Sequence, residues 1–146
     1  LRKVLAGCDI VKLTPVELPL LFQTESTETA ATRLRELGAK LVVVTLGESG
    51  CYVDGPQGQA YLAAEAVTVV DKTGAGDAFM TGLLSELLEK LGGPGPDDLV
   101  ARLKALPMEQ VKRACARGNH LGAQVCTAMG ATTNLPKKKL DDPVLR

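Results

Sequence analysis

The sequence predicts an α/β fold in which a mainly parallel sheet is covered by helices on both faces. Short apolar runs such as residues 41–46 are typical of buried strands, and they alternate with segments whose apolar residues recur at helical spacing. This alternation is characteristic of parallel sheets packed between helical layers. With 146 residues, 45% of them hydrophobic, the chain has the size of one ordinary domain with a substantial core.

The first half of the chain is predicted to supply the centre of the sheet. The strongest strand signal is the apolar run Leu41-Val-Val-Val-Thr-Leu46. Proline at the first helical position loses no hydrogen bond, so Thr14-Pro15 indicates a helix start, and Gly38 is suited to end a helix. The expected elements are a strand over residues 9–13, a helix opened by Thr14-Pro15, a helix over 26–37, a strand over 41–46, a turn over 47–50 and a strand over 51–53.

The second half is predicted to contain two long helices. Leu83, Leu87 and Leu91 recur at a spacing that places them on one buried helical face, and Gly92 and the prolines after it end that helix. The expected elements are a turn at Asp54-Gly55, a strand over residues 59–63, a strand over 67–70, a helix from Asp77 to Leu91, a loop over 92–107 and a helix over 108–128.

The segment around residues 67–77 carries the clearest functional signal. The β-branched run over 67–70 leads through Asp71 and Thr73-Gly74-Ala75-Gly76 to the helix that begins at Asp77. Glycines let backbone N–H groups turn inward together, and the helix N-terminus adds its positive dipole end, so this arrangement favours an anion. A carboxylate at the mouth of such a site suits transfer of a phosphoryl group to a hydroxyl, because a base must accept the hydroxyl proton.

The run Asp71-Lys-Thr-Gly-Ala-Gly-Asp77, with Phe79, Gly82 and Leu83 after it, resembles the second signature of the ribokinase/PfkB family of carbohydrate kinases. The resemblance implies a ribokinase-like three-layer sandwich and ATP-dependent phosphorylation of a sugar hydroxyl, most like that of bacterial fructokinases. In such a kinase Asp77 is the base, and the N–H groups of Gly74, Ala75 and Gly76 stabilise the transferring oxygens. The resemblance also suggests a monovalent cation such as K⁺ near Asp71 and Thr73.

Lys72 departs from that signature, because a small hydroxyl residue or proline is usual there. The lysine leaves the glycine turn intact. Either it adds a cation near the phosphates or it points to solvent, and we favour the solvent interpretation.

A second resemblance concerns magnesium. The run Lys12-Leu-Thr-Pro-Val-Glu17 resembles the family's Asn-x-x-Glu motif, which implies that Glu17 holds Mg²⁺ through water, although Thr14 replaces the usual Asn. The alternative is that Glu17 is only a favourable charge in the first turn of a helix.

Two further segments resemble the family's nucleotide side. Thr45-Leu46-Gly47, followed by Gly50, resembles the turn that borders the nucleotide, with an ordinary hairpin turn as the alternative. Asn119 matches a residue near the adenine. Gly118 and Gly122 are poor helix formers, so close packing or a ligand is expected to require them. The single histidine, His120, is assigned no role.

Composition and motif spacing exclude several other classes. Lys plus Arg and Asp plus Glu are equal at 17 each, and aromatic residues make up only 3%, so neither nucleic acid nor a membrane surface is expected as a partner. No phosphate-binding Gly-x-x-x-x-Gly-Lys-Ser/Thr motif is present, Phe79 replaces the third glycine of a dinucleotide fingerprint, and no metal cluster has ligand spacing. Widely separated cysteines favour reduced thiols in a cytoplasmic protein.

The resemblance covers essentially the whole chain but only the second half of the family's usual length. Together with a first residue, Leu1, that is not Met, this leads us to interpret residues 1–146 as the C-terminal nucleotide-binding and catalytic half, with the sugar-binding half absent. The expected partners are ATP and a small sugar, and a homodimer of the full-length protein stays open. Two alternatives remain: a nucleotide-binding half or packing module without catalysis of its own, and a nucleoside or vitamin-precursor kinase.

Overall fold

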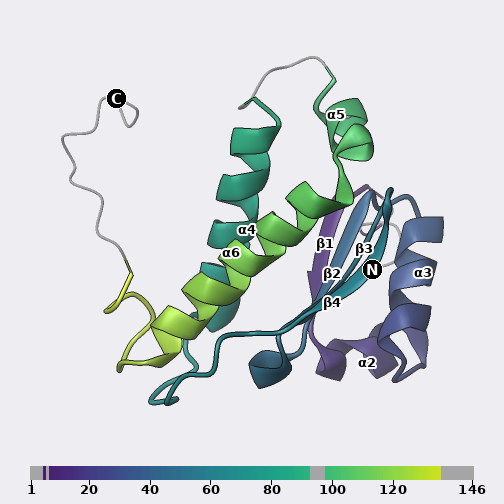
Figure 1. Cartoon of the computed structure of the whole chain (residues 1–146). Helices are drawn as coiled ribbons and strands as arrows, with labels where there is room; N and C mark the ends of the chain where they lie inside the picture. Colours follow the sequence, from purple (N-terminus) through teal and green to yellow (C-terminus); the bar gives the residue numbers. More distant parts are fainter. Residues whose placement is uncertain (1–4, 6, 93–97, 136–146) are drawn as a thin grey trace.

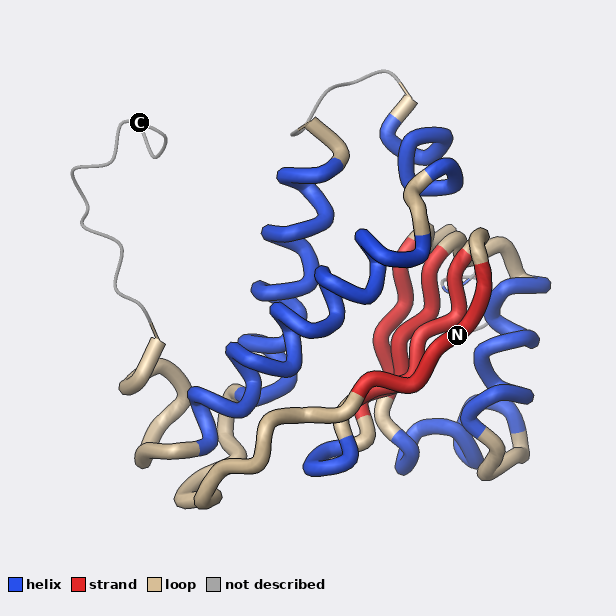
Figure 2. Tube along the Cα trace, in the orientation of Figure 1, coloured by secondary structure: helices blue, strands red, loops and turns tan. Residues whose placement is uncertain are grey.

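The computed structural model describes residues 5, 7–92 and 98–135, and it shows an α/β arrangement (Figures 1 and 2). The elements in chain order are β1 (Ile10–Leu13), η1 (Pro15–Glu17), α2 (Leu18–Phe22), α3 (Thr27–Glu36), β2 (Leu41–Thr45), η2 (Gly47–Ser49), β3 (Cys51–Gly55), β4 (Gly58–Leu62), α4 (Ala75–Lys90), α5 (Leu99–Ala105) and α6 (Met108–Cys126).

The sheet is mixed, so the prediction of a mainly parallel sheet is wrong. Its described strands lie in the order β1-β2-β3-β4; β1 and β2 are parallel, whereas β2–β3 and β3–β4 are antiparallel. The connections explain the difference. A parallel pair needs a long crossover, which α2 and α3 provide between β1 and β2, but the short turns after β2 and β3 can only join antiparallel neighbours.

Helices cover both faces of the sheet, as the sequence predicts, and give three layers (Figure 1). The side chains of β2 alternate between two cores. Leu41 and Val43 pack on the side of α4, α5 and α6, whereas Val42 and Val44 pack on the side of α2 and α3. Because both faces of this strand are buried, its sequence is a continuous apolar run.

Close approach of α4 and α6 explains Gly82 and Gly118. A Cβ on Gly82 would lie 2.6 Å from the carbonyl oxygen of Arg117, and a Cβ on Gly118 would lie 2.9 Å from both the ring and the carbonyl oxygen of Phe79. Neither position has room for a side chain. Of the two reasons expected for Gly118 and Gly122, close packing or a ligand, close packing accounts for Gly118, while a Cβ on Gly122 would lie 3.2 Å from the Ala75 carbonyl oxygen.

Several predicted boundaries were wrong. Residues 67–70 form no strand: Val67, Val69 and Val70 are substantially exposed, and the Val70 N–H donates to the Cys126 carbonyl at 2.8 Å instead of joining the sheet. Asp54-Gly55 belongs to β3 and is not a turn. The predicted loop over 92–107 contains helix α5, while residues 93–97 lie outside the described part. Helix α4 begins at Ala75, two residues before Asp77, and α6 ends at Cys126.

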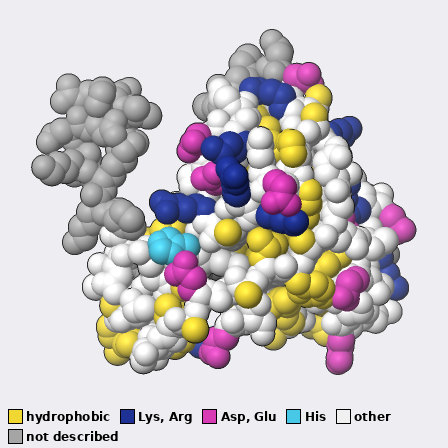
Figure 3. All heavy atoms as spheres, viewed as in Figure 1, with side chains coloured by type: hydrophobic (Ala, Val, Ile, Leu, Met, Phe, Trp, Pro, Cys, Tyr) yellow, Lys and Arg dark blue, Asp and Glu magenta, His cyan; other side chains and the backbone are white. Residues whose placement is uncertain are grey.

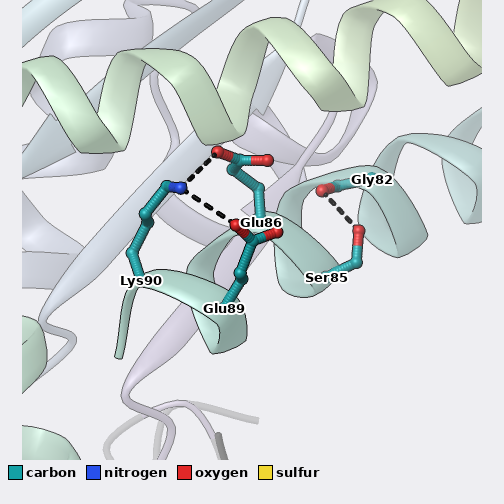
Figure 4. Close-up of polar contacts among 5 residues, drawn as sticks. All are labelled: Gly82, Ser85, Glu86, Glu89 and Lys90. Carbon is teal, nitrogen blue, oxygen red and sulfur yellow. Dashed lines mark hydrogen bonds and ion pairs between the residues drawn. The ribbon is translucent and has the colours of Figure 1, made fainter. Parts of the chain in front are cut away.

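The C-terminal end of α4 is held by charges (Figure 4). Lys90 lies 3.5 Å from Glu86, one turn earlier, and 3.1 Å from the neighbouring Glu89, and Ser85 donates to the Gly82 carbonyl at 3.0 Å. A cation in the last turn also complements the negative end of the helix dipole. These contacts are local and structural.

Candidate functional site

A pocket of about 470 Å³ opens at the edge of the sheet where the parallel strands β1 and β2 end. Ligands of open α/β sheets bind at the carboxyl ends of strands, so this position is typical of a binding site. The pocket is bordered by the ends of β1 and β2, the turn η2, the segment after β4, the start of α4 and the last turns of α6. Its lining residues are Lys12, Thr14, Pro15, Thr45, Gly47, Glu48, Gly50, Ala64, Glu65, Ala66, Val67, Val69, Lys72, Ala75, Gly76, Phe79, Asn119, Gly122, Ala123 and Cys126.

The glycine turn before α4 brings the helix N-terminus to this pocket. Gly74 is the N-cap and has φ of 81°, a left-handed conformation that favours glycine, and a Cβ there would lie 2.6 Å from the Ala131 Cβ. Ala75 and Gly76 line the pocket. Among the described residues, the Gly74 and Gly76 N–H groups have no hydrogen-bond partner, whereas the Ala75 N–H donates to the Lys72 carbonyl at 3.2 Å. Unpartnered N–H groups at a helix N-terminus are suited to an anion.

Asp77 is the third residue of α4 and is exposed. Its side chain has no hydrogen-bond or ion-pair partner within the described part of the chain, and Thr81 bonds only to its backbone carbonyl. Asp77 does not line the pocket itself; it follows Gly76, which does. The carboxylate is therefore exposed and unpartnered among the described residues, and it is adjacent in sequence to a residue that lines the pocket.

Lys12 approaches the same helix end from β1. A Cβ on Gly76 would lie 3.2 Å from the Lys12 Nζ, so the ammonium occupies the space that the glycine leaves open. A cation beside unpartnered N–H groups strengthens the preference for an anion. Sequence reasoning missed Lys12, although its position near the carboxyl end of a predicted parallel strand was a usable signal.

Glu17 serves a local role in the structure. Its Oε2 accepts hydrogen bonds from the Thr14 N–H at 2.6 Å and the Thr14 hydroxyl at 2.7 Å, an arrangement that caps the helical turn. The Thr14 hydroxyl bond is the main reason why the pKa of Glu17 is lowered. Glu17 lies outside the pocket lining, but its Oε1 has no partner among the described residues.

Asp71 connects the loop before α4 to the turn after α6. Its Oδ1 accepts the Thr73 N–H at 2.9 Å, and its Oδ2 accepts the Gly130 N–H at 2.9 Å. These bonds, the one from Gly130 first, lower the pKa of Asp71. Asp71 and Thr73 thus lie next to Gly74, but neither lines the pocket.

The turn after β2 is both a hairpin turn and a wall of the pocket. Thr45, Gly47 and Gly50 all line the pocket, and β2 and β3 pair in antiparallel fashion on either side of η2. Gly50 has φ of 96°, and a Cβ there would lie 1.9 Å from the Leu62 carbonyl oxygen. The turn therefore depends on glycine at this position.

Asn119 lies inside the pocket wall and is buried. Its Nδ2 donates to the Leu62 carbonyl at 3.4 Å and the Ala63 carbonyl at 3.2 Å, which fastens the end of β4 to α6. Next along α6, His120 Nδ1 lies 2.9 Å from Glu65 Oε1. In Figure 3 the cyan histidine lies on the surface beside an acidic side chain. Both contacts hold the segment that follows β4 against α6.

No group of three His, Cys, Asp or Glu side chains in the described ranges is placed to hold a metal ion. Within those ranges no helix is both long enough and apolar enough to cross a membrane. On the face in Figure 3, acidic and basic side chains are interspersed.

Comparison with known proteins gives the family. The model of the family described as pfkB family carbohydrate kinase matches residues 1–138. The chain belongs to the PfkB family of carbohydrate kinases.

Relatives in this family include kinases for different acceptors. The chain is 33% identical over 131 residues to aminoimidazole riboside kinase of Salmonella typhimurium, covering 90% of this chain and 37% of that protein. It is 34% identical over 140 residues to a fructokinase of Klebsiella pneumoniae, covering 94% and 41%. A fructokinase structure from Vibrio cholerae with fructose, ADP and calcium bound has a TM-score of 0.74 at 34% identity, covering 92% of this chain and 40% of that one. The chain therefore spans about two fifths of these PfkB relatives.

The pocket brings together only part of the predicted PfkB site. The predicted residues that line it are Ala75, Gly76, Thr45, Gly47, Gly50 and Asn119, whereas Gly74, Asp77, Asp71, Thr73 and Glu17 lie outside the lining. Lys72, which we expected to point to solvent, is exposed and yet lines the pocket mouth. Sequence reasoning also missed the apolar wall, formed by Val67, Val69, Ala123 and Cys126 among others.

Proposed function

We propose that the protein transfers the γ-phosphoryl group of ATP to a sugar hydroxyl and that this chain supplies the nucleotide side and the catalytic base. The observation that carries the proposal is the exposed Asp77 carboxylate, unpartnered among the described residues, which directly follows a glycine turn whose Ala75 and Gly76 line the pocket. A site that only held phosphate would gain nothing from a carboxylate at this position, whereas a hydroxyl nucleophile needs a base.

In the proposed reaction the sugar oxygen forms a bond to the γ-phosphorus while the bond from that phosphorus to the bridging oxygen of ADP breaks. Asp77 accepts the hydroxyl proton. The unpartnered Gly74 and Gly76 N–H groups donate to the transferring oxygens, and the Ala75 N–H joins them by exchanging its 3.2 Å bond to the Lys72 carbonyl. Lys12 adds positive charge beside Gly76.

We assign the nucleotide base to the apolar wall of the pocket. Val67, Val69 and Ala123 offer apolar contact, and Asn119 also lines the pocket. An apolar cleft with a few polar groups is typical of small-molecule sites. Thr45, Gly47 and Gly50 also line the pocket and would then border the nucleotide.

The chain has residues that could hold the two ions expected of a PfkB kinase, Mg²⁺ and a monovalent cation. The free Oε1 of Glu17 can hold a water of Mg²⁺, whose chemistry is to neutralise phosphate charge during transfer. Both carboxylate oxygens of Asp71 already accept N–H groups, so a monovalent cation such as K⁺ would be held by carbonyl oxygens around Asp71 and Thr73.

A riboside is the second class of acceptor, since a relative at 33% identity is an aminoimidazole riboside kinase. The test is release of ADP by the full protein in the presence of ATP, Mg²⁺ and a panel of fructose, ribose and aminoimidazole riboside. Acceptor-dependent release is expected. ADP release that no acceptor stimulates would contradict the proposal.

The alternative of a nucleotide-binding half without catalysis rests on the coverage of about two fifths of the relatives. On that view residues 1–146 alone bind ATP but transfer no phosphoryl group, because nothing in the described part closes over the acceptor. Calorimetry with ATP and the same ADP assay on residues 1–146 separate the two roles. Sugar-dependent ADP release by this chain alone would contradict the half-kinase view.

A further inference from the structure

Lys72 and Glu48 face each other across the mouth of the pocket. Lys72 belongs to the loop before α4 and Glu48 to the turn η2, and the Lys72 Nζ lies 3.2 Å from the Glu48 Oε1. Both side chains line the pocket. Their side chains are 70% and 76% exposed, so this ion pair contributes little to stability and is readily exchanged for a stronger partner.

The backbone of Lys72 is fixed next to the helix N-terminus. Its carbonyl accepts the Ala75 N–H at 3.2 Å, and its neighbour Asp71 is held by the Thr73 and Gly130 N–H groups. The lysine side chain therefore starts close in sequence to the unpartnered N–H groups of Gly74 and Gly76. A flexible four-carbon chain from this point can serve either Glu48 or an anion in the pocket.

The charges that line the pocket cancel without a ligand. Two lysines, Lys12 and Lys72, are balanced by two glutamates, Glu48 and Glu65, and Glu65 contacts His120. A nucleoside triphosphate brings several negative charges, and the lysines stabilise those charges only when they pair with the phosphates and not with the glutamates. A triphosphate is a better partner for the Lys72 ammonium than one exposed carboxylate, because it offers the ammonium several charged oxygen acceptors at once.

We propose that Lys72 is a nucleotide-phosphate ligand that Glu48 holds while the pocket is empty. This inference rests on the proposed function, since it assigns a further binding residue to the same ATP site. When the triphosphate enters, the Lys72 ammonium leaves Glu48 and pairs with phosphate oxygens. Glu48 thus competes with the nucleotide for one cation.

The first test is ATP affinity in the full protein, measured by calorimetry with adenosine as the phosphate-free comparison. Lys72→Gln is expected to weaken ATP binding about 5- to 20-fold and to leave adenosine affinity unchanged. This range lies between the contribution of an exposed ion pair and that of a hydrogen bond to a charged group. Lys72→Arg should retain most of the ATP affinity. The decrease of ATP affinity with rising salt should become shallower in Lys72→Gln.

The second test is a double-mutant cycle with Glu48→Gln. This variant should tighten ATP binding by about 2- to 5-fold, because the competing carboxylate is gone. Part of that gain comes from removing the direct repulsion between the Glu48 carboxylate and the phosphates of ATP. If Glu48 acts through Lys72, the gain must be smaller in the Lys72→Gln background, and the cycle measures that difference.

The outcomes separate this inference from the proposed function. ATP affinity that falls in Lys72→Gln, together with a non-additive cycle, supports the inference. ATP binding that is the same in wild type and Lys72→Gln overturns the role of Lys72 and leaves the kinase proposal intact. A full protein that binds no ATP overturns both.

Discussion

The two ends of helix α4 carry carboxylates in opposite situations. At the N-terminal end Asp77 is exposed and has no partner among the described residues, and Gly74 and Gly76 leave N–H groups free. At the C-terminal end Glu86 and Glu89 both contact Lys90 (Figure 4). The C-terminal charges satisfy one another, whereas the N-terminal groups are left for a ligand. One helix thus separates a structural end from a candidate reactive end.

The largest effect is expected from closing the space at Gly76. In Gly76→Val a branched side chain would displace Lys12 and fill the place where phosphate meets the N–H groups, so turnover should fall by ~10³-fold or more. Gly76 is helical, and among the described residues the atom outside its own helix that an added Cβ would meet within 4 Å is Nζ, the end of the Lys12 side chain, so the fold should persist. Steady-state kinetics and circular dichroism check both statements.

Gly76→Ala is the matched control for this change, because its single methyl meets Lys12 at 3.2 Å and requires only a small shift. Its loss of turnover should be clearly smaller than that of Gly76→Val. Equal, wild-type turnover in both variants would show that no phosphate approaches the helix here.

An intermediate effect is expected from Asp71→Asn. Asp71 accepts N–H groups with both oxygens, and an asparagine would present an NH₂ group to one of those donors. The loop before Gly74 should loosen, and turnover should fall by about 10-fold while the helical content stays unchanged. Wild-type kinetics in Asp71→Asn would show that this link to Gly130 does not position the glycine turn.

A smaller effect is expected on the stability of the folded chain in acid. The Gly130 and Thr73 N–H groups lower the pKa of Asp71 in the folded chain, so the unfolded chain binds a proton more readily at this position. The resulting stabilisation is present above the unfolded pKa and is lost as pH falls through the folded pKa, in a window below about pH 4. Glu17, whose pKa the Thr14 hydroxyl lowers, acts in the same direction.

Thermal unfolding between pH 7 and pH 3 measures this acid dependence. The slope of melting temperature against pH below about pH 4 should be shallower in Asp71→Asn than in wild type. Identical slopes would mean that the bonds from Gly130 and Thr73 are not formed in solution.

The smallest effect is expected at the other end of the helix. Lys90→Ala removes two ion pairs at the protein surface, a half-buried one to Glu86 and one to the exposed Glu89, so the melting temperature should fall by only about 1–3 °C. Turnover should not change. A marked loss of activity in Lys90→Ala would remove the distinction between the two ends of α4.

Local patterns predicted much of this architecture but not the pairing of the strands. The strand predicted over residues 41–46 is β2, which ends one residue earlier at Thr45, and it was recognisable because burial on both faces produces a continuous apolar run. Residues 67–70 have the same β-branched character, yet Val67 and Val69 line the pocket instead of pairing in the sheet. Periodicity cannot distinguish these cases, since it reports an apolar surface and not what covers it.

The candidate site was predictable where backbone conformation constrains the residue type. Gly74 and Gly50 require left-handed φ values and close contacts, and both were found as glycine turns. Lys12 lies near the end of a strand that the sequence predicted, but its approach to Gly76, and the contact of Glu48 with Lys72, depend on which segments meet at one edge of the sheet. That information lies in the tertiary structure and not in a local motif.

The most direct test of the reactive end is a comparison of two carboxylates on the same helix. Asp77→Asn should lower the rate of phosphoryl transfer in the full protein by ~10²–10⁴-fold with nearly unchanged ATP affinity, because the amide cannot accept the hydroxyl proton. Glu86→Gln, at the structural end, should transfer at the wild-type rate. Single-turnover assays with ATP and the preferred acceptor measure both variants. An Asp77→Asn variant that is as fast as Glu86→Gln would contradict the assignment of Asp77 as the base.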